Sequence, residues 1–266
     1  MKTRVSLFIF CIQMIAVCGF AADRRIDGNG NPETREIKIS DYDEIGSADF
    51  EYEQSDKAPY LSVTIDENLF DYLVTEVEGG TLKIYPKSIK KGFNNNSYDL
   101  RPTVYKIKSN SKELKELNTV GSGSFIISKP TKVNRMEINM AGSGNVELRG
   151  PVKGYKLECN MAGSGNIIAK DIQLDNLSCS LASSGEIEVI GTVDRASFNV
   201  AGSGEIKAFD CQARKAECNI ASSGEISVYA TQILDANIVG SGEIHYKGDP
   251  EISKSIMGSG SINKVK

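Results

Sequence analysis

The chain has 266 residues, with 31 Lys and Arg against 35 Asp and Glu, and a formal net charge of −4 at pH 7. Phosphate backbones are bound by concentrated Lys and Arg, so this charge balance gives no reason to expect a nucleic-acid partner. The chain has no Trp and one His, and imidazole chemistry is therefore scarce.

The first residues have the pattern of a secretory signal peptide. Lys2 and Arg4 precede an apolar run over residues 5–17, and small residues flank a cleavage point after Ala21. We therefore expect residues 1–21 to be removed and the rest of the chain to be exported.

A membrane span and a lipid anchor are the alternatives at this end. The apolar run is short for a span and contains Gln13. Cys18 could become a lipidated first residue, although Val17 stands where a lipoprotein signal has a small residue. No second apolar segment follows, so we expect no membrane span in the mature chain.

The second half of the sequence repeats one phrase, as in NMAGSGNVEL, NVAGSGEIKA and NIVGSGEIHY. A period near twenty that drifts by a residue or two indicates a solenoid with adjustable coils, and it excludes the strict period of hexapeptide helices. The last glycine of each phrase marks a sharp turn, and successive markers are 18 to 21 residues apart: Gly123, Gly144, Gly165, Gly185, Gly204, Gly224, Gly242 and Gly260.

Apolar and polar residues alternate on both sides of each turn, which predicts strands with one buried face. Such coils must stack to share a core, so the sequence predicts an all-β, right-handed parallel β-helix. Two positions after the markers we expect an apolar ladder of Phe125, Val146, Ile167, Ile187, Ile206, Ile226, Ile244 and Ile262. Before the turns we expect a hydrogen-bonded amide ladder of Asn118, Asn139, Asn160, Asn199, Asn219 and Asn237, with Ser180 and Ser255 in the same column. A corner this sharp is expected to need positive φ at its glycine.

Four cysteines remain after the signal peptide. Cys159, Cys179 and Cys218 fall in one inward column and are predicted to be buried free thiols. A Cys159–Cys179 bridge is not excluded by distance, although stacked side chains offer poor disulfide geometry. Cys211 lies on another side of the coil, where it could be exposed.

Residues 22–117 are expected to form the first coil, with a corner at residues 46–48, and an insertion that caps the core. Within it, Asp66 could cap a short helix over residues 67–77, and EGGTLKIYP suggests a hairpin. Residues 87–102 are polar and are expected to form a loop. Residues 118–266 are expected to form the regular coils.

The GSG-[NE]-[IV] corners, the GSAD of the first coil and the stretch LFDYLVTEVEGGTLKIYPK together resemble the head GIN domain family of auto-transporter adhesins. The resemblance covers nearly all of the mature chain. It implies a pectin-lyase-like β-helix in the periplasm or on the surface of a Gram-negative bacterium, a role in adhesion, and no catalytic residues. The chain departs from the corner pattern at Ser183 and Ser222.

The position after the marker glycine carries a column of glutamates, Glu186, Glu205, Glu225 and Glu243. Neighbours about 4.8 Å apart repel by only about 1 kcal/mol in water, so a solvated acidic ridge is one interpretation. A line of weak Ca²⁺ sites is the other, because carboxylates and Ser hydroxyls are hard oxygen ligands. No Asp-rich loop of fixed spacing supports a metal site.

Catalysis and small-ligand binding are two further hypotheses. A polysaccharide-processing enzyme of the lyase type needs a base beside clustered acids, but Arg149, Arg195 and Arg214 are spread over different coils. His245 stands alone, with no Cys or Asp partner recurring at catalytic spacing. A lipid or small-ligand site in the cap could use the front tyrosines, which are Tyr42, Tyr52, Tyr60, Tyr72, Tyr85, Tyr98 and Tyr105. We expect a noncatalytic adhesion module without a cofactor, which binds a glycan or protein.

Overall fold

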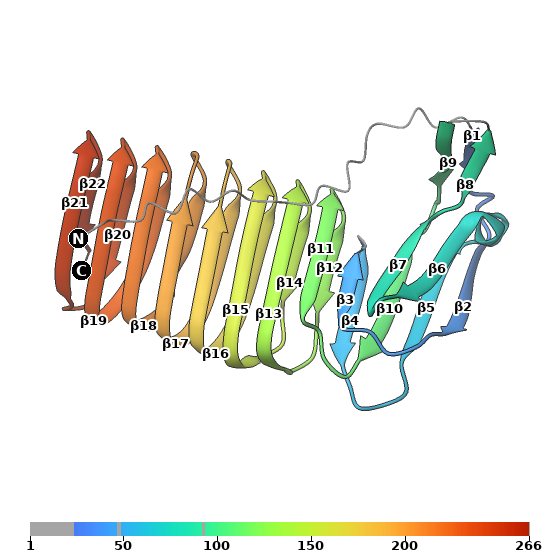
Figure 1. Cartoon of the computed structure of the whole chain (residues 1–266), viewed down its shortest axis with the longest axis horizontal. Coiled ribbons are helices and arrows are strands. Elements are labelled where there is room, and N and C mark those ends of the chain that lie inside the picture. Colours follow the sequence, from blue (N-terminus) through green and yellow to red (C-terminus); the bar gives the residue numbers. More distant parts are fainter. Residues whose placement is uncertain (1–23, 47–48, 92–93, 266) are drawn as a thin grey trace.

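The computed structural model describes residues 24–46, 49–91 and 94–265, with side chains omitted for 90–96. The predicted signal peptide over residues 1–21, Cys18, and positions 47 and 48 of the first corner lie outside these ranges. The described chain is a β-solenoid of about seven turns of stacked parallel coils, which confirms the predicted fold class. Figure 1 shows the coils side by side, with a differently built front region at one end.

Each regular coil runs into the sharp corner on one strand and leaves it on another. The strands of this part are β11 (Glu116–Gly121), β12 (Ser124–Ile127), β13 (Thr131–Gly142), β14 (Asn145–Leu148), β15 (Val152–Gly163), β16 (Asn166–Leu181), β17 (Glu186–Val200), β18 (Glu205–Ser222), β19 (Glu225–Gly240), β20 (Glu243–Lys247), β21 (Glu251–Gly258) and β22 (Ser261–Lys264). All pair in parallel with the next coil, so that equivalent residues of successive repeats are direct neighbours.

The inward residues of these strands form one continuous core. Every member of the predicted apolar ladder, from Phe125 to Ile262, is at most 9% exposed. Ile187, Ile206 and Ile226 are neighbours in register, as the repeat requires. The ladder is therefore confirmed, and it exists because an isolated coil cannot cover its own apolar face.

The last coil closes the core differently. Lys254 occupies the inward column in register with the buried Ala236. Its Nζ donates to the Ile262 carbonyl at 3.2 Å and lies 5.2 Å from the centre of the Tyr246 ring. An inward lysine at a sheet edge opposes pairing with another chain, because pairing would bury its charge.

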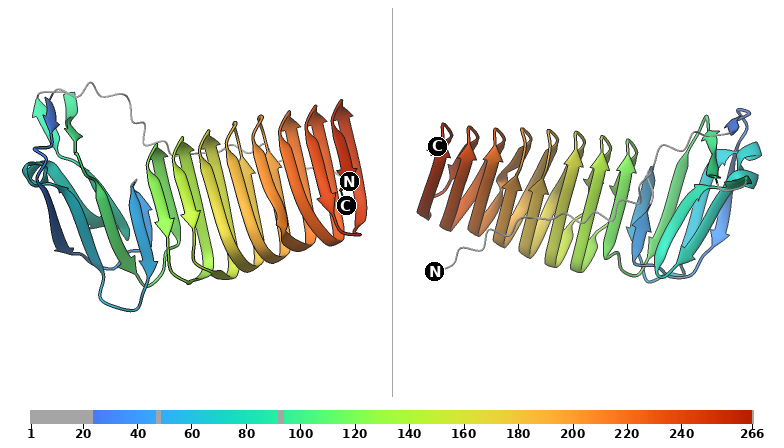
Figure 2. Two further views of the ribbon diagram at one scale, coloured as in Figure 1. Left: turned by 180° about the vertical axis from the view of Figure 1, so that it is seen from behind. Right: turned by 45° about the horizontal axis from the view of Figure 1, so that its top comes forward.

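The front region combines antiparallel and parallel strands. It consists of β1 (Arg24–Asp27), β2 (Pro32–Lys38), β3 (Glu44–Gly46), β4 (Phe50–Gln54), β5 (Tyr60–Asp66), the 3₁₀ helix η1 (Glu67–Tyr72), β6 (Leu73–Glu78), β7 (Thr81–Pro86), β8 (Ser88–Lys91), β9 (Asn94–Arg101) and β10 (Lys106–Ser111). β3 and β4 pair in parallel with β11 and β12, so they form the first coil. β10 extends one sheet in parallel with β4, and β5 and β2 continue it in antiparallel order. Figure 2 shows this region at the opposite end of the stack from β21 and β22.

Two local predictions for the front region are wrong. The helix expected over 67–77 is a short 3₁₀ helix that gives way to β6, which pairs with β7 as a hairpin. Thr75 and Val77 are β-branched and suit a strand better than a helix. The loop expected over 87–102 contains the hairpin β8–β9, and β9 pairs in parallel with β1.

The cysteine predictions are confirmed in one part and wrong in another. Cys159, Cys179 and Cys218 are buried free thiols, and Cys159 lies in register with Cys179. Contact with Cys159 and burial raise the pKa of the Cys179 thiol well above its ordinary value. Cys211 is also buried, because its strand turns it into the core beyond the bend, and burial raises its pKa to about 12.

Candidate functional site

The corner glycines are needed for close packing rather than for positive φ. None of the marker glycines has a positive φ, and the expectation of that conformation there is wrong. The left-handed conformation falls two positions earlier, for example at Gly142 (φ 145°) and at Ser222 (φ 132°). A Cβ on Gly204 would lie 2.6 Å from the Gly185 carbonyl oxygen and would also overlap the Leu181 side chain. The markers therefore allow one corner to stack directly on the previous one.

The predicted amide ladder is present in two runs. The Asn139 amide donates to Asn118 at 3.1 Å, and Asn160 donates to Asn139 at 3.0 Å. A second run joins Asn199, Asn219 and Asn237 with bonds of 3.0 Å each. Ser180 separates the runs because its side chain is too short to continue them.

The glutamate column is paired with Lys207 and His245, which the sequence analysis did not connect with it. Lys207 lies one outward position beyond Glu205, and its Nζ is 2.6 Å from a Glu186 carboxylate oxygen and 3.5 Å from one of Glu205. His245 Nε2 lies 3.1 Å from a Glu243 oxygen and 3.6 Å from a Glu225 oxygen.

His245 therefore has two partners in the glutamate column, and neither of them is a Cys or an Asp. The hydrogen bond that Lys207 donates to the Glu186 carboxylate raises the pKa of the Lys207 ammonium group. Over the described ranges, no group of three His, Cys, Asp or Glu side chains is placed to hold a metal ion. The column forms a mixed-charge surface in which Glu186 and Glu205 face the Lys207 ammonium group, and Glu225 and Glu243 face the His245 ring.

All three arginines considered as catalytic bases contact a carboxylate. Arg149 Nε lies 2.6 Å from a Glu147 oxygen, and Arg214 binds both carboxylate oxygens of Asp194. Arg195 lies at the edge of that second pair, 3.6 Å from Asp194. These contacts orient the guanidinium groups along the coil surface.

The front tyrosines are divided between core and surface. Tyr42 and Tyr52 are buried, and their hydroxyls contact Ser109 at 2.7 Å and Ser111 at 3.0 Å. Burial raises the pKa of Tyr52 to about 12 and that of Tyr42 further. Tyr72 packs edge-on against Tyr98. These contacts of Tyr42, Tyr52, Tyr72 and Tyr98 are those of structural side chains.

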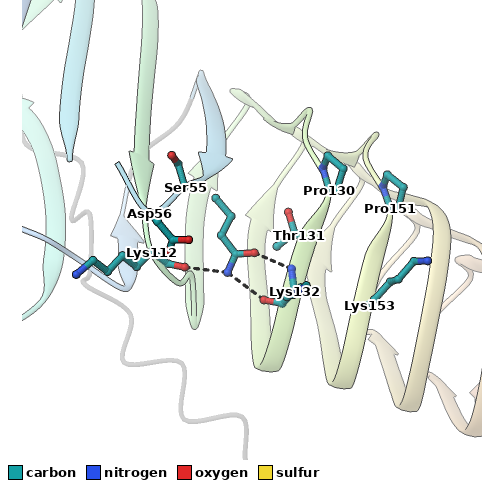
Figure 3. A pocket seen from close by; sticks show the side chains of 9 residues that line it. Ser55, Asp56, Lys112, Pro130, Thr131, Lys132, Pro151 and Lys153 are labelled. Carbon is teal, nitrogen blue, oxygen red and sulfur yellow. Dashed lines mark hydrogen bonds between the residues drawn. The ribbon is translucent and has the colours of Figure 1, made fainter. Parts of the chain in front are cut away.

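Where the front region meets the regular coils there is a groove that the sequence analysis did not identify. It has a volume of about 330 Å³ and is lined by Gln54, Ser55, Asp56, Lys112, Pro130, Thr131, Lys132, Pro151 and Lys153. Figure 3 shows Pro130 and Pro151 on consecutive coils, with Lys132 and Lys153 below them and Lys112 at the opposite end. The repeated Pro-x-Lys at 130–132 and 151–153 is the signal in the sequence that could have indicated it.

The side chain of Gln54 holds this groove together. Its amide nitrogen donates to the Lys112 carbonyl at 2.9 Å and to the Lys132 carbonyl at 3.1 Å, and its amide oxygen accepts from the Lys132 backbone N–H at 2.6 Å. The backbones that carry two of the three lysines are thus fixed relative to each other.

Comparison with known proteins places this architecture in a family. The family described as "Putative auto-transporter adhesin, head GIN domain" matches residues 41–154 and, a second time, residues 138–250. The chain belongs to this family. The two matches overlap along the regular coils, as expected if the family pattern is itself the repeated corner.

Three solved structures show how widely this head GIN architecture is shared. This chain is 98% identical to a Parabacteroides distasonis protein described as a "putative lipid binding protein", with a TM-score of 0.87. The match covers 91% of this chain and 100% of that protein. A "putative adhesin" of Parabacteroides merdae is 32% identical over the same shares, with a TM-score of 0.85. A Bacteroides fragilis protein with 24% identity and a TM-score of 0.64, over 90% of this chain and 100% of its own, shares the fold. No curated protein matches the chain.

Family membership supports an adhesion-like role and an extracytoplasmic location, and the family and these structural relatives are described as adhesins or binding proteins rather than enzymes. In the part of the chain that the structure describes, no helix is long and apolar enough to cross a membrane.

Proposed function

We propose that the chain is an exported, noncatalytic adhesion module of the periplasm or cell surface of a Gram-negative bacterium, and that its coils present polar columns to a glycan or protein. The observation that carries this proposal is the mixed-charge surface after the corners. There, Glu186, Glu205 and Glu225 repeat a polar position once per coil on a stiff support, and Lys207 contacts the first two of them. Regularly spaced groups on a rigid sheet bind a repeating ligand without first having to be ordered.

Binding to cell-surface material tests the proposal. Purified protein should bind whole cells or an array of glycans and envelope proteins in a saturable manner, and heat-denatured protein should not. Incubation with polygalacturonate should release no new chain ends, since Arg149 and Arg214 are held in ion pairs. The absence of binding to any of these materials, or turnover of the polymer, would contradict the proposal.

Lipid binding is a second candidate, favoured by the description of the 98% identical protein. In this chain the supporting observation is an apolar patch at the far end, where Met257 is 72% and Val239 57% exposed as register neighbours. Co-sedimentation with phospholipid vesicles distinguishes the candidates. If lipid is the ligand, Met257→Ser should reduce vesicle binding and leave glycan binding unchanged.

A further inference from the structure

The groove between Gln54 and Lys153 concentrates positive charge. Lys112, Lys132 and Lys153 are all exposed, and within the described ranges none of their ammonium groups has an ion-pair partner. One carboxylate, that of Asp56, lies in the same groove. Three other lysines of the coils, Lys156, Lys207 and Lys264, contact carboxylates instead. The three groove lysines are therefore left for an anion from outside the chain.

Lys132 and Lys153 are the start of a straight polar row. Lys132 lies in register with Lys153, and the row continues through Gln173, Thr192 and Gln212, one residue per coil and about 4.8 Å apart. All five side chains are exposed. Gln173 and Thr192 line a second hollow of about 340 Å³, which also contains Asp175 and Asp194, and Asp194 is paired with Arg214. A long ligand that lies along the solenoid axis would meet cations first and then amide and hydroxyl groups.

The chemistry of this row matches an extended polyhydroxylated chain that carries acid groups. Lysines bind carboxylates or sulfates as point charges, while Gln and Thr side chains donate to and accept from hydroxyls. The apolar lining of the first hollow consists of the rings of Pro130 and Pro151, which offer an acyl chain no enclosed space. An anionic lipid is therefore the weaker match for this site.

We propose that the groove of Lys112, Lys132 and Lys153 binds the acid groups of an acidic polysaccharide, whose chain continues along Gln173 and Thr192. This inference rests on the proposed adhesion function and specifies its ligand class. Gln54 contributes by fixing the lysine backbones, so the cations are placed before the ligand arrives.

The test compares two variants of equal charge. Lys112→Gln/Lys132→Gln/Lys153→Gln removes the groove lysines, and Lys38→Gln/Lys106→Gln/Lys170→Gln removes three exposed lysines elsewhere. Affinity is measured by calorimetry or biolayer interferometry for polygalacturonate, a sulfated glycosaminoglycan and neutral dextran of similar length. The groove variant should lose at least about tenfold in affinity for an acidic polymer, and the control variant less than about twofold. Melting temperatures of both should match the wild type, because all six side chains are exposed.

Four outcomes would overturn the inference. These are equal losses in both variants, equal binding of dextran, binding to neither acidic polymer, and lysine-dependent binding to phosphatidylglycerol vesicles that is tighter than binding to either acidic polymer. Cell binding by the groove variant separates this inference from the proposed function. If the variant adheres as the wild type does, the groove assignment is wrong and the adhesion function stands. Charge reversal by Lys132→Glu/Lys153→Glu should reduce binding further than the glutamines and provides a second, independent readout.

Discussion

The regular coils and the front region build their cores from different kinds of contact. In the coils each structural residue has a copy in register above and below, as Ile187, Ile206 and Ile226 do. In the front region the decisive contacts occur once. Asp66 is fully buried and accepts hydrogen bonds from the Gly30 N–H and from both the N–H and the hydroxyl of Thr103.

This difference determines how far the destabilising effect of one substitution should extend through the structure. The stability of stacked repeats is approximately a sum of coil and interface contributions, so one weakened coil keeps its neighbours. When a contact that occurs only once is lost, no equivalent contact in a neighbouring coil remains. The junction between the two regions joins both kinds of structure, and substitutions there should be the most severe.

The largest effect is expected at Phe125. Its ring stacks on that of Phe50 with centroids 5.5 Å apart, and the two rings link the first coil to the regular coils. Phe125→Ala should lower the free energy of unfolding by about 3–5 kcal/mol, through lost burial and a residual cavity. Denaturant unfolding measures this. Ile262→Ala in the last coil is the comparison. An equally large decrease in the free energy of unfolding there would show that the junction contributes no more to stability than the end of the stack.

Gly204→Val tests the stacking of corners within the coils. The new side chain would meet the Gly185 carbonyl and Leu181, and such overpacking costs about 1–3 kcal/mol. Gly46→Val is the matched control from the front region, because a Cβ at Gly46 meets no atom within 4 Å. Thermal unfolding should show a clear loss for the first variant and little change for the second. Equal melting temperatures would mean that the corner yields to the extra volume.

Repetition also explains which parts of the structure could be predicted from the sequence. Eight copies of an apolar position establish the inward column even if single residues are ambiguous. The segment around Thr75 and Val77 occurs once, and its apolar spacing fitted a helix until pairing with β7 decided for a strand. Propensity of a single segment is a weak guide when tertiary pairing overrides it.

The surface chemistry was harder to predict for a related reason. Lys207 and His245 stand in the same outward column, and each contacts one glutamate two residues before it and a second one on the preceding coil, where the drifting repeat length hides the register. The groove lysines were missed because Lys112 and Gln54 come from the nonrepeating region and meet the coils only in the folded chain. Features carried by one column were predictable, and those that combine columns or regions were not.

Asp66 should make the front region sensitive to acid. Burial alone raises its pKa, but the bonds from Thr103 and Gly30 outweigh this and hold the pKa below its ordinary value. The unfolded chain therefore binds a proton at higher pH than the folded chain, so this contribution is present above about pH 4 and is lost as pH falls further. Asp66→Asn should lower the melting temperature at pH 6, by less than Gly204→Val does, and should flatten its decline towards pH 3. Asp249→Asn removes a largely exposed carboxylate, and it should change neither the melting temperature at pH 6 nor its decline towards pH 3. A parallel decline in wild type and Asp66→Asn would contradict the role of Asp66.

Substitutions in the amide ladder are expected to change stability in both directions. Asn219→Ala breaks the bonds to Asn199 and Asn237 and should cost about 1–2 kcal/mol. Ser180→Asn places an amide between Asn160 and Asn199, its register neighbours, and should add about 0.5–1 kcal/mol by joining the two runs. Unfolding of both variants in urea measures the two changes. If Ser180→Asn destabilises the protein, the small side chain of Ser180 is needed for packing, and the two runs of asparagines cannot be joined there.

The smallest effect is expected in the glutamate column, and it separates a surface from a metal site. Lys207 already lies between Glu186 and Glu205, and His245 between Glu225 and Glu243, so a bound cation would have to compete with them. Glu205→Gln/Glu225→Gln should change the free energy of unfolding by less than about 0.5 kcal/mol, since exposed ion pairs contribute little. Millimolar Ca²⁺ should change the melting temperature of neither the wild type nor the variant, because a ligand stabilises a protein only when it binds the folded state preferentially. Lys207→Gln is the sharper control, as it removes the competing cation and leaves the carboxylates free. If Ca²⁺ raises the melting temperature of the wild type, and the double variant loses that rise, the column is a cation site and Lys207 and His245 are displaced on binding.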